Sequence, residues 1–263
     1  MPRILQFSDP HLLADPHGFC RGRPPRQALV EGLTQALQQL DQIPDLLLIS
    51  GDLCQDESWG GYGRLREVLE ELELLDRLPL ALIPGNHDHP QLLRAAFGRH
   101  CTLAPGLLPL GDWQLLLLNT HRSGTVAGWI SPTQRQWMLQ QLTALSPPTL
   151  VALHHPPVPI GSAELDPIAL SQPDPVLEPL LRCSAVRGVV FGHIHQHWFG
   201  ALPRPQGGTP LPLWGCPSSL VAFAAVQPCP LGQADWPGAR LLELGDQGEI
   251  NTTLLRWPPL RSA

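Results

Sequence analysis

The sequence contains no lysine, and all 17 of its basic residues are arginine. This absence excludes a phosphate-binding loop of the Gly-Lys-Ser/Thr type, whose lysine contacts the phosphates of a nucleotide. It also excludes Schiff-base chemistry, which needs a side-chain amine. Charged residues make up only 15% of the chain against 43% hydrophobic residues. This balance favours a large buried core over disorder.

Cysteines are few and scattered along the chain. None of the six belongs to a Cys-x-x-Cys pair, so no structural zinc cluster is expected. No apolar run reaches the roughly 18–20 residues that a membrane-spanning helix needs. No signal-peptide pattern precedes the first predicted strand. We therefore expect a cytoplasmic protein with reduced thiols and no membrane association.

The negative charge of the chain argues against some partners. Its formal net charge is −6 and its pI about 6.0. Proteins that bind the nucleic-acid backbone usually present a basic surface, so nucleic-acid binding and nuclease activity are not expected. A small anionic substrate remains compatible, because bound metal ions create a local positive charge. The sequence leaves the oligomeric state open.

Short apolar runs recur, and polar residues follow each of them. Runs of four to eight apolar residues are typical of buried strands. The expected strands are Arg3–Phe7, Leu46–Ser50, Leu80–Pro84, Thr149–Leu153 and Gly188–Phe191.

Helical patterns lie between these strands. Leucine spacing predicts helices around residues 29–40 and 65–72, and a third is expected over Pro132–Leu145. The alternation of strand and helix indicates βαβ units. The last 60 or so residues differ, and four strands are expected there: Leu213–Trp214, Ser219–Phe223, Arg240–Leu244 and Ile250–Trp257. The prediction is a layered α/β sandwich, formed as a single domain over 1–263, with a metal-binding core (1–200) and a β-rich completion (201–263).

The polar clusters that follow the five strands carry metal-ligand chemistry. They are Asp9-Pro10-His11, Gly51-Asp52, Gly85-Asn86-His87-Asp88, His154-His155-Pro156 and Gly192-His193-Ile194-His195. Ligands in open α/β sheets bind beyond the carboxyl ends of the strands. His, Asp and Asn side chains suit Fe, Mn or Zn. Each cluster taken alone also fits an ordinary turn, but five of them in this position indicate a shared metal site.

The order of these clusters resembles that of the calcineurin-like metallophosphoesterases, from Asp9 to His195. The resemblance implies an αββα-type sandwich that holds two divalent metal ions. It places Asp9, His11, Asp52 and His195 on one ion, and Asp52, Asn86, His154 and His193 on the other. Asp52 then bridges both ions, and His87 stands beside them as the catalytic acid.

The same resemblance implies a reaction. The charge of two divalent ions exceeds that of Asp9 and Asp52, so the site attracts a phosphate and acidifies a water molecule. A hydroxide that bridges the metals then attacks phosphorus, and His87 protonates or stabilises the leaving oxygen.

Further segments resemble the bacterial class III cyclic AMP phosphodiesterases of the CpdA type. They include Gly51–Asp56, Leu82–Asp88, Trp113–Leu118, Gly192–Gln196 and Cys216–Ser219. This similarity implies hydrolysis of 3′,5′-cyclic AMP or a related cyclic nucleotide, with Fe or Mn as cofactors and Zn as a third option. It also implies substrate contacts from His11, Asp52, Asn86, His87 and His195. Proline-rich stretches before His154 and at 172–181 depart from the pattern and leave base selectivity open.

Other interpretations stay open at this point. The same site fits a glycerophosphodiesterase, a nucleotide-sugar pyrophosphatase or another phosphoester hydrolase, and a non-enzymatic scaffold is a further alternative. Among residues outside the motifs, His155 is expected to support the pocket. Trp198 or Phe223 is a candidate for stacking on a base. The remaining histidines outside the motifs are interpreted as surface, loop or rim residues: His17, His89, His100, His121 and His197.

Overall fold

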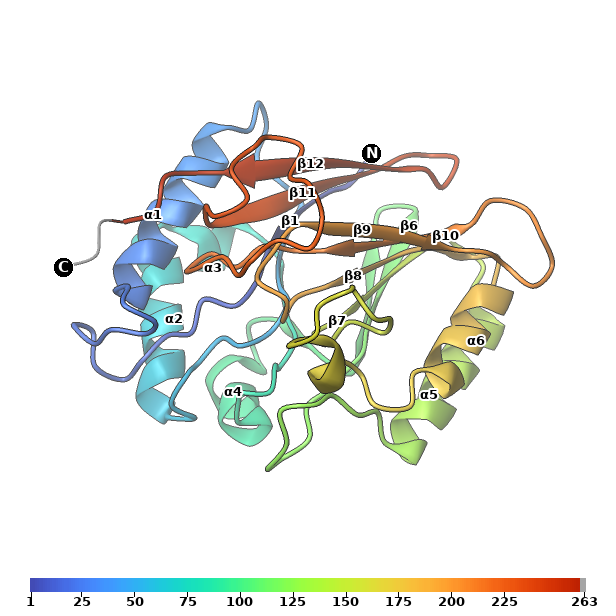
Figure 1. Ribbon diagram of the computed structural model, residues 1–263, viewed down its shortest axis with the longest axis horizontal. Coiled ribbons are helices and arrows are strands. Elements are labelled where there is room, and N and C mark those ends of the chain that lie inside the picture. The colour runs from blue at the N-terminus through green and yellow to red at the C-terminus, as the bar shows by residue number, and fades with distance from the viewer. Residues whose placement is uncertain (261–263) are drawn as a thin grey trace.

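The computed structural model describes residues 1–260, which form two six-stranded sheets packed face to face between helices (Figure 1). The first sheet has the order β12-β11-β1-β2-β3-β4. Its strands are β1 (Arg3–Phe7), β2 (Leu46–Ile49), β3 (Leu80–Leu82), β4 (Thr102–Leu103), β11 (Gly238–Leu244) and β12 (Ile250–Arg256). β1 to β4 run parallel, and β11 and β12 add an antiparallel edge.

The second sheet has the order β5-β6-β7-β8-β10-β9. Its strands are β5 (Gly106–Leu110), β6 (Trp113–Leu117), β7 (Thr149–Leu153), β8 (Val186–Phe191), β9 (Trp198–Leu202) and β10 (Leu211–Gly215). The central strands β6, β7, β8 and β10 are parallel, whereas β5 and β9 pair antiparallel at the two edges.

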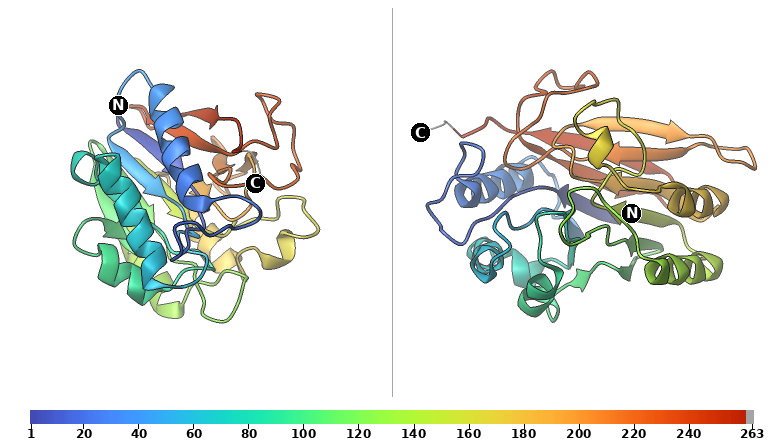
Figure 2. Two further views of the ribbon diagram at one scale, coloured as in Figure 1. Left: turned by 90° about the vertical axis from the view of Figure 1, so that its left-hand side faces the viewer. Right: turned by 60° about the horizontal axis from the view of Figure 1, so that its bottom comes forward.

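Two groups of helices cover the outer faces of the sandwich, one group on each side (Figure 2). The first sheet carries α1 (Pro25–Gln38), α2 (Trp59–Glu71), α3 (Leu74–Arg77) and α4 (Pro90–Phe97). The second carries α5 (Pro132–Ala144) and α6 (Asp174–Arg182), and a short 3₁₀ helix, η1 (Asp166–Ile168), lies between β7 and α6. Within residues 1–260, no helix combines the length and the apolar character needed to cross a membrane.

Alternation along the strands builds three hydrophobic layers. In β2, Leu47 and Ile49 pack against the helices of the first sheet, whereas Leu46 and Leu48 point into the layer between the sheets. Successive side chains of a strand face opposite sides, so a strand that is apolar throughout is covered on both faces. The uninterrupted apolar runs in the sequence therefore reflect burial in the middle of an αββα sandwich, and the predicted fold class is confirmed.

The main correction lies in the C-terminal part. Ser219–Phe223 was expected to be a strand, but this segment is irregular. Its backbone groups bond to the loops beside the metal-ligand residues instead of to a strand: Ser219 N–H donates to Ser8 O (2.9 Å) and Phe223 N–H to His195 O (3.2 Å). The apolar pattern was real, but it marks a segment packed on the site. We call residues 218–227 the covering segment.

Smaller differences between prediction and structure concern the ends of helices and strands that were not predicted. α1 ends at Gln38, two residues before the predicted end at Leu40. β9 and the hairpin of β5 and β6 were not predicted as strands. α5 begins at Pro132 as predicted, behind Ser131, whose side chain accepts a hydrogen bond from Gln134 N–H.

Candidate metal centre

The loops that follow β1, β2, β3, β7 and β8 meet at one end of the sandwich. Backbone hydrogen bonds hold them together, from Asp9 N–H to Gly51 O (3.0 Å), from His11 N–H to Asp52 O (2.9 Å) and from Gly192 N–H to His154 O (3.0 Å). The parallel strands bring their carboxyl ends to the same edge of each sheet. The packing of the two sheets then brings the two edges together.

The backbone is strained at five of the predicted ligands. They have φ angles between 48° and 67°, in the left-handed region: Asp9, His11, Asp52, His193 and His195. Asp and His tolerate this region better than most residues. Such a conformation costs on the order of 1–3 kcal/mol per residue and persists where the surroundings enforce it. Its concentration at this edge indicates that side-chain placement there outweighs local backbone preference.

Four predicted ligands form a first group of donor atoms. The carboxylates of Asp9 and Asp52 and the rings of His11 and His195 each offer one atom, and these atoms lie within 4.8 Å of one another. His11 Nε2 lies 3.1 Å from His195 Nε2 and 3.8 Å from Asp52 Oδ2. His195 Nε2 lies 3.4 Å from Asp9 Oδ1. All four residues are buried.

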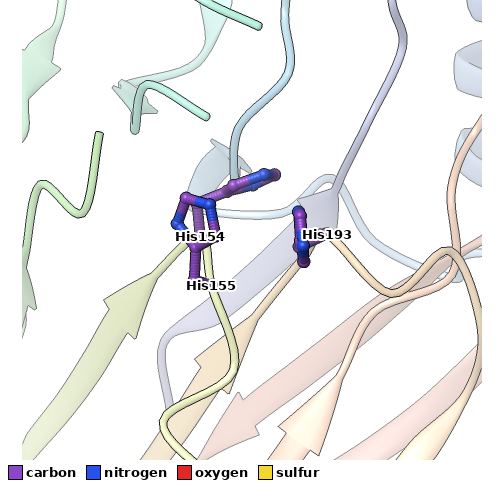
Figure 3. Close-up of side chains that lie close together, drawn as sticks. All are labelled: His154, His155 and His193. Atoms are coloured by element: carbon purple, nitrogen blue, oxygen red, sulfur yellow. The ribbon is translucent and has the colours of Figure 1, made fainter. Parts of the chain in front are cut away.

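A second group of donors adjoins the first through Asp52. His154 Nε2 lies 3.5 Å from Asp52 Oδ2 and 3.3 Å from Asn86 Oδ1. His193 Nε2 is buried and has no hydrogen-bond partner within residues 1–260. Figure 3 shows the rings of His154 and His193 together where β7 and β8 end. A buried nitrogen without a partner is costly, and a metal ion would satisfy it, so the donors fit a dinuclear metal site with Asp52 Oδ2 between the two groups.

His155 lies in the same cluster but has other partners. One of its nitrogen atoms comes within 4.8 Å of donor atoms of His154 and His193. Its Nδ1, however, lies 2.7 Å from Thr120 Oγ1, and its Nε2 lies 2.9 Å from Val126 O. With both ring nitrogens engaged, His155 supports the wall of the site rather than offering a free donor.

Carbonyl groups orient the rings of two predicted ligands. His154 Nδ1 donates to Ser50 O (2.8 Å), and His195 Nδ1 donates to Val221 O (3.0 Å). In each ring the proton is thereby placed on Nδ1, and the Nε2 lone pair faces the site. Val221 belongs to the covering segment, of which Ser219–Phe223 was expected to be a strand. The sequence feature closest to Val221 that could have indicated this role is the Cys216–Ser219 stretch, which resembles the CpdA type.

The covering segment also fixes the His195 ring. The Phe223 ring stacks on it with centroids 4.1 Å apart and an angle of 4° between the planes. Ser218 Oγ donates to Asp9 O (2.8 Å) and ties the segment to the first ligand loop. Phe223, one of two candidates for stacking on a base, thus contacts a predicted ligand histidine. Trp198, the other candidate, is buried and donates to Ile160 O (3.1 Å).

The pKa values of the buried histidines are shifted in opposite directions. Burial lowers the pKa of His11 to about 4 and that of His193 to about 3, so both rings are neutral, as metal ligands must be. Burial opposes protonation of His154 too, but the charge of Asp52 outweighs it and raises the pKa of His154 to about 9. A metal ion bound at His154 Nε2 would replace the second proton of this ring, while the proton on Nδ1 stays bonded to Ser50 O. Burial disfavours ionisation of Asp52, yet His154 and His11 hold its pKa well below the usual range.

His87 lies beside the donor groups and outside them. Its backbone N–H donates to Asp52 Oδ1 (2.9 Å), and its half-buried ring lies edge-on to His11 with centroids 5.3 Å apart. Gln55 Nε2 donates to His87 Nδ1 (3.2 Å), which leaves the ring proton on Nε2. Neither cluster of potential metal ligands includes His87.

Asp88 organises the loop that carries Asn86 and His87. Its carboxylate accepts hydrogen bonds from the N–H groups of Leu53, Cys54 and Gly85 and from the Tyr62 hydroxyl. Burial, and then the charge of Asp52, raises the pKa of Asp88 to about 7. The carboxyl links the second and third ligand loops, a role that the sequence did not reveal.

The other histidines are distributed around the fold. His89 caps the N-terminus of α4, where its Nδ1 accepts from Leu92 N–H, and His100 lies 3.2 Å from Arg66 Nη1. His17 is exposed, as expected. His121 departs from a simple surface interpretation, because its Nδ1 donates to Gly85 O (2.9 Å). His197 lies against Arg240, with 3.0 Å between Nδ1 and Nη2.

Comparisons with known proteins agree with this geometry. Residues 2–197 match the family model described as calcineurin-like phosphoesterase. The chain belongs to this family. Among solved structures, a dimetal phosphatase from Danio rerio has a similar fold, with a TM-score of 0.60, 14% identity and coverage of 97% of this chain and 98% of that one.

Within this family, the chain is similar to proteins named as cyclic nucleotide phosphodiesterases. A protein of Synechococcus sp. (strain WH7803), named as a probable cyclic nucleotide phosphodiesterase, is 47% identical over 100% of this chain and 99% of its own length. The 3′,5′-cyclic adenosine monophosphate phosphodiesterase CpdA of Pseudomonas aeruginosa is 31% identical over 96% of this chain and 89% of its own. The resemblance to the CpdA type is thereby confirmed.

Gly51 offers a test of the second donor group. A Cβ atom at this position would lie 2.0 Å from His154 Nδ1, and the φ of 109° is unfavourable for any other residue. We expect Gly51→Ala to displace His154, to lower the metal content and to reduce turnover by at least about 100-fold, as misplacement by about 1 Å does at reacting centres. Metal analysis and phosphodiester hydrolysis measure both effects.

The matched control is Gly63→Ala in α2, where an added Cβ would meet nothing within 4 Å. This change is expected to keep activity and to stabilise the helix by about 0.5–1 kcal/mol. If Gly51→Ala retained full metal content and turnover, the packing of His154 against Gly51 would not matter for the site.

Proposed function

We propose that this chain hydrolyses 3′,5′-cyclic nucleotides, with cyclic AMP opened to 5′-AMP as the main reaction. One observation carries the proposal: Asp52 Oδ2 lies between two groups of buried donors, 3.8 Å from His11 Nε2 and 3.5 Å from His154 Nε2. A shared carboxylate is what two adjacent divalent ions need. The names of the relatives supply the substrate class.

The proposed ligands follow from the two groups. Asp9, His11, Asp52 and His195 would hold one ion, and Asp52, Asn86, His154 and His193 the other. Mixed nitrogen and oxygen donors of this kind favour Fe or Mn, with Zn as the alternative. The bound ions would acidify a water molecule and offset the charge of the phosphate.

The residues of the chain then have separate tasks. We assign the substrate phosphate to the face formed by His11, Asp52, Asn86, His87 and His195. The Nε2 proton of His87, kept there by Gln55, is available to the 3′ oxygen as it leaves. This oxygen is a poor leaving group, because it departs as an alkoxide unless it receives a proton.

We further propose that residues 1–263 act as one domain in the cytoplasm. Four proposed ligands follow strands of the first sheet and three follow strands of the second, so neither half of the chain offers the complete set: Asp9, His11, Asp52 and Asn86, against His154, His193 and His195. All six cysteines are free thiols, which accords with a reducing compartment.

A substrate panel tests the function. Purified protein loaded with Mn²⁺ or Fe²⁺ is incubated with cyclic AMP, cyclic GMP, glycerophosphodiesters and a nucleotide-sugar. We expect cyclic AMP to give 5′-AMP, with one oxygen from ¹⁸O-labelled water in its phosphate and no covalent intermediate. If cyclic AMP stays intact while a glycerophosphodiester or a nucleotide-sugar is cleaved efficiently, the substrate assignment is wrong.

A further inference from the structure

A tight turn places an arginine at the rim of the metal centre. Cys20 and Arg23 exchange backbone hydrogen bonds, from Cys20 N–H to Arg23 O (2.9 Å) and from Arg23 N–H to Cys20 O (3.0 Å). The two residues between them, Arg21 and Gly22, have φ angles of 50° and 74°. This closed two-residue turn projects the exposed Arg21 side chain at its tip.

Two contacts fix the turn against the site. On one side, the Arg21 guanidinium lies over the Phe223 ring, 5.0 Å from its centroid, and Phe223 in turn stacks on His195. On the other side, Cys20 Sγ donates to Gln55 Oε1 (3.6 Å), and Gln55 bonds to His87. Arg21 therefore contacts the ring that stacks on a proposed ligand, and its neighbour Cys20 contacts the residue that bonds to the proposed acid.

No carboxylate in the described part of the chain forms an ion pair with Arg21. Within residues 1–260, no carboxylate lies within 4.0 Å of its guanidinium, whereas Arg26 and Arg64 each pair with a glutamate. A planar cation held over an aromatic ring keeps its N–H donors for a ligand. The guanidinium of Arg21 thus keeps its donors available beside the proposed site.

We propose that Arg21 recognises the purine base of the substrate, an inference that rests on the proposed cyclic nucleotide activity. The phosphate is assigned to the metal face, and Arg21 reaches that face only across the rings of Phe223 and His195. Its position therefore matches the base end of the nucleotide. The guanidinium can stack on a purine and donate to its ring nitrogens.

A pair of substrates and a matched pair of variants test this proposal. Steady-state rates are measured with cyclic AMP and with methyl riboside 3′,5′-cyclic phosphate, which has no base. We expect Arg21→Ala to raise KM for cyclic AMP about 10-fold, in the range of base stacking, with kcat within about twofold. KM for the baseless substrate should not change. Arg21→Lys, which keeps the charge but not the plane, should recover only part of the loss.

Arg23→Ala is the control, because it removes the same charge from the same turn at a residue that does not contact Phe223. It should leave both substrates unaffected, and metal content should be equal in all variants. An equal rise in KM for both substrates would assign Arg21 to the phosphate, and no rise for either would remove it from the binding site; each result overturns the proposal. A wild-type enzyme that cleaves neither substrate would instead refute the proposed function, and this inference with it.

Discussion

Replacement of Asp52 by alanine is expected to lower turnover by roughly 10⁴-fold or more and to empty much of the metal site. Asp52 Oδ2 is the atom that both donor groups share, at 3.8 Å from His11 Nε2 and 3.5 Å from His154 Nε2. Its Oδ1 accepts the His87 backbone N–H. In the proposed site, the change therefore removes a ligand from both ions, a negative charge from the cluster and an anchor of the proposed acid.

Elemental analysis and cyclic AMP hydrolysis measure these losses together. Replacing a ligand that serves one ion alone, as in His193→Ala, should cost less than Asp52→Ala. Asp112→Ala removes the same charge from an exposed turn between β5 and β6 and should be neutral. If Asp52→Ala kept a tenth or more of wild-type turnover, Asp52 would not bridge two catalytic ions.

Replacement of His87 by alanine should slow turnover by about 10²–10⁴-fold while metal content stays at the wild-type level. The ring lies next to His11 but outside both donor groups, and Gln55 keeps its proton on Nε2. The loss should shrink for a nitrophenyl ester, because nitrophenolate leaves without a proton. Rates with cyclic AMP and with the nitrophenyl ester, measured beside metal content, report on each point.

His89→Ala is the matched control for His87→Ala. His89 lies two residues after His87, just outside the motif, and it caps α4. Its loss should cost about 1 kcal/mol of stability but little turnover. Metal loss in the His87 variant would identify His87 as a ligand. An equal slowing for good and poor leaving groups would reduce its role to electrostatic stabilisation.

The central strands could be predicted because burial on both faces makes their sequences apolar throughout. Among them, β1 and β7 were predicted to the residue. The edge strands β5 and β9 were missed because they are only partly covered, whereas β6, a mostly buried central strand, was missed despite its apolar pattern. The strand expected over Ser219–Phe223 was wrong for another reason. Leu220 is buried and the apolar residues after it are partly buried, but the backbone there bonds to the loops that carry the candidate ligands instead of to a strand.

The sequence by itself determined which residue types follow each strand, and thus the candidate ligands and the family. It could do so because the side chains that carry metal chemistry are few and each follows a buried strand. The bridging place of Asp52 was expected from the family resemblance, and the tertiary structure brings its Oδ2 between the two donor groups. Tertiary structure alone decided that Val221 and Phe223 orient His195 and that Arg21 lies over Phe223. These relations join segments up to about two hundred residues apart. They depend on the packing of two sheets, which no local pattern encodes.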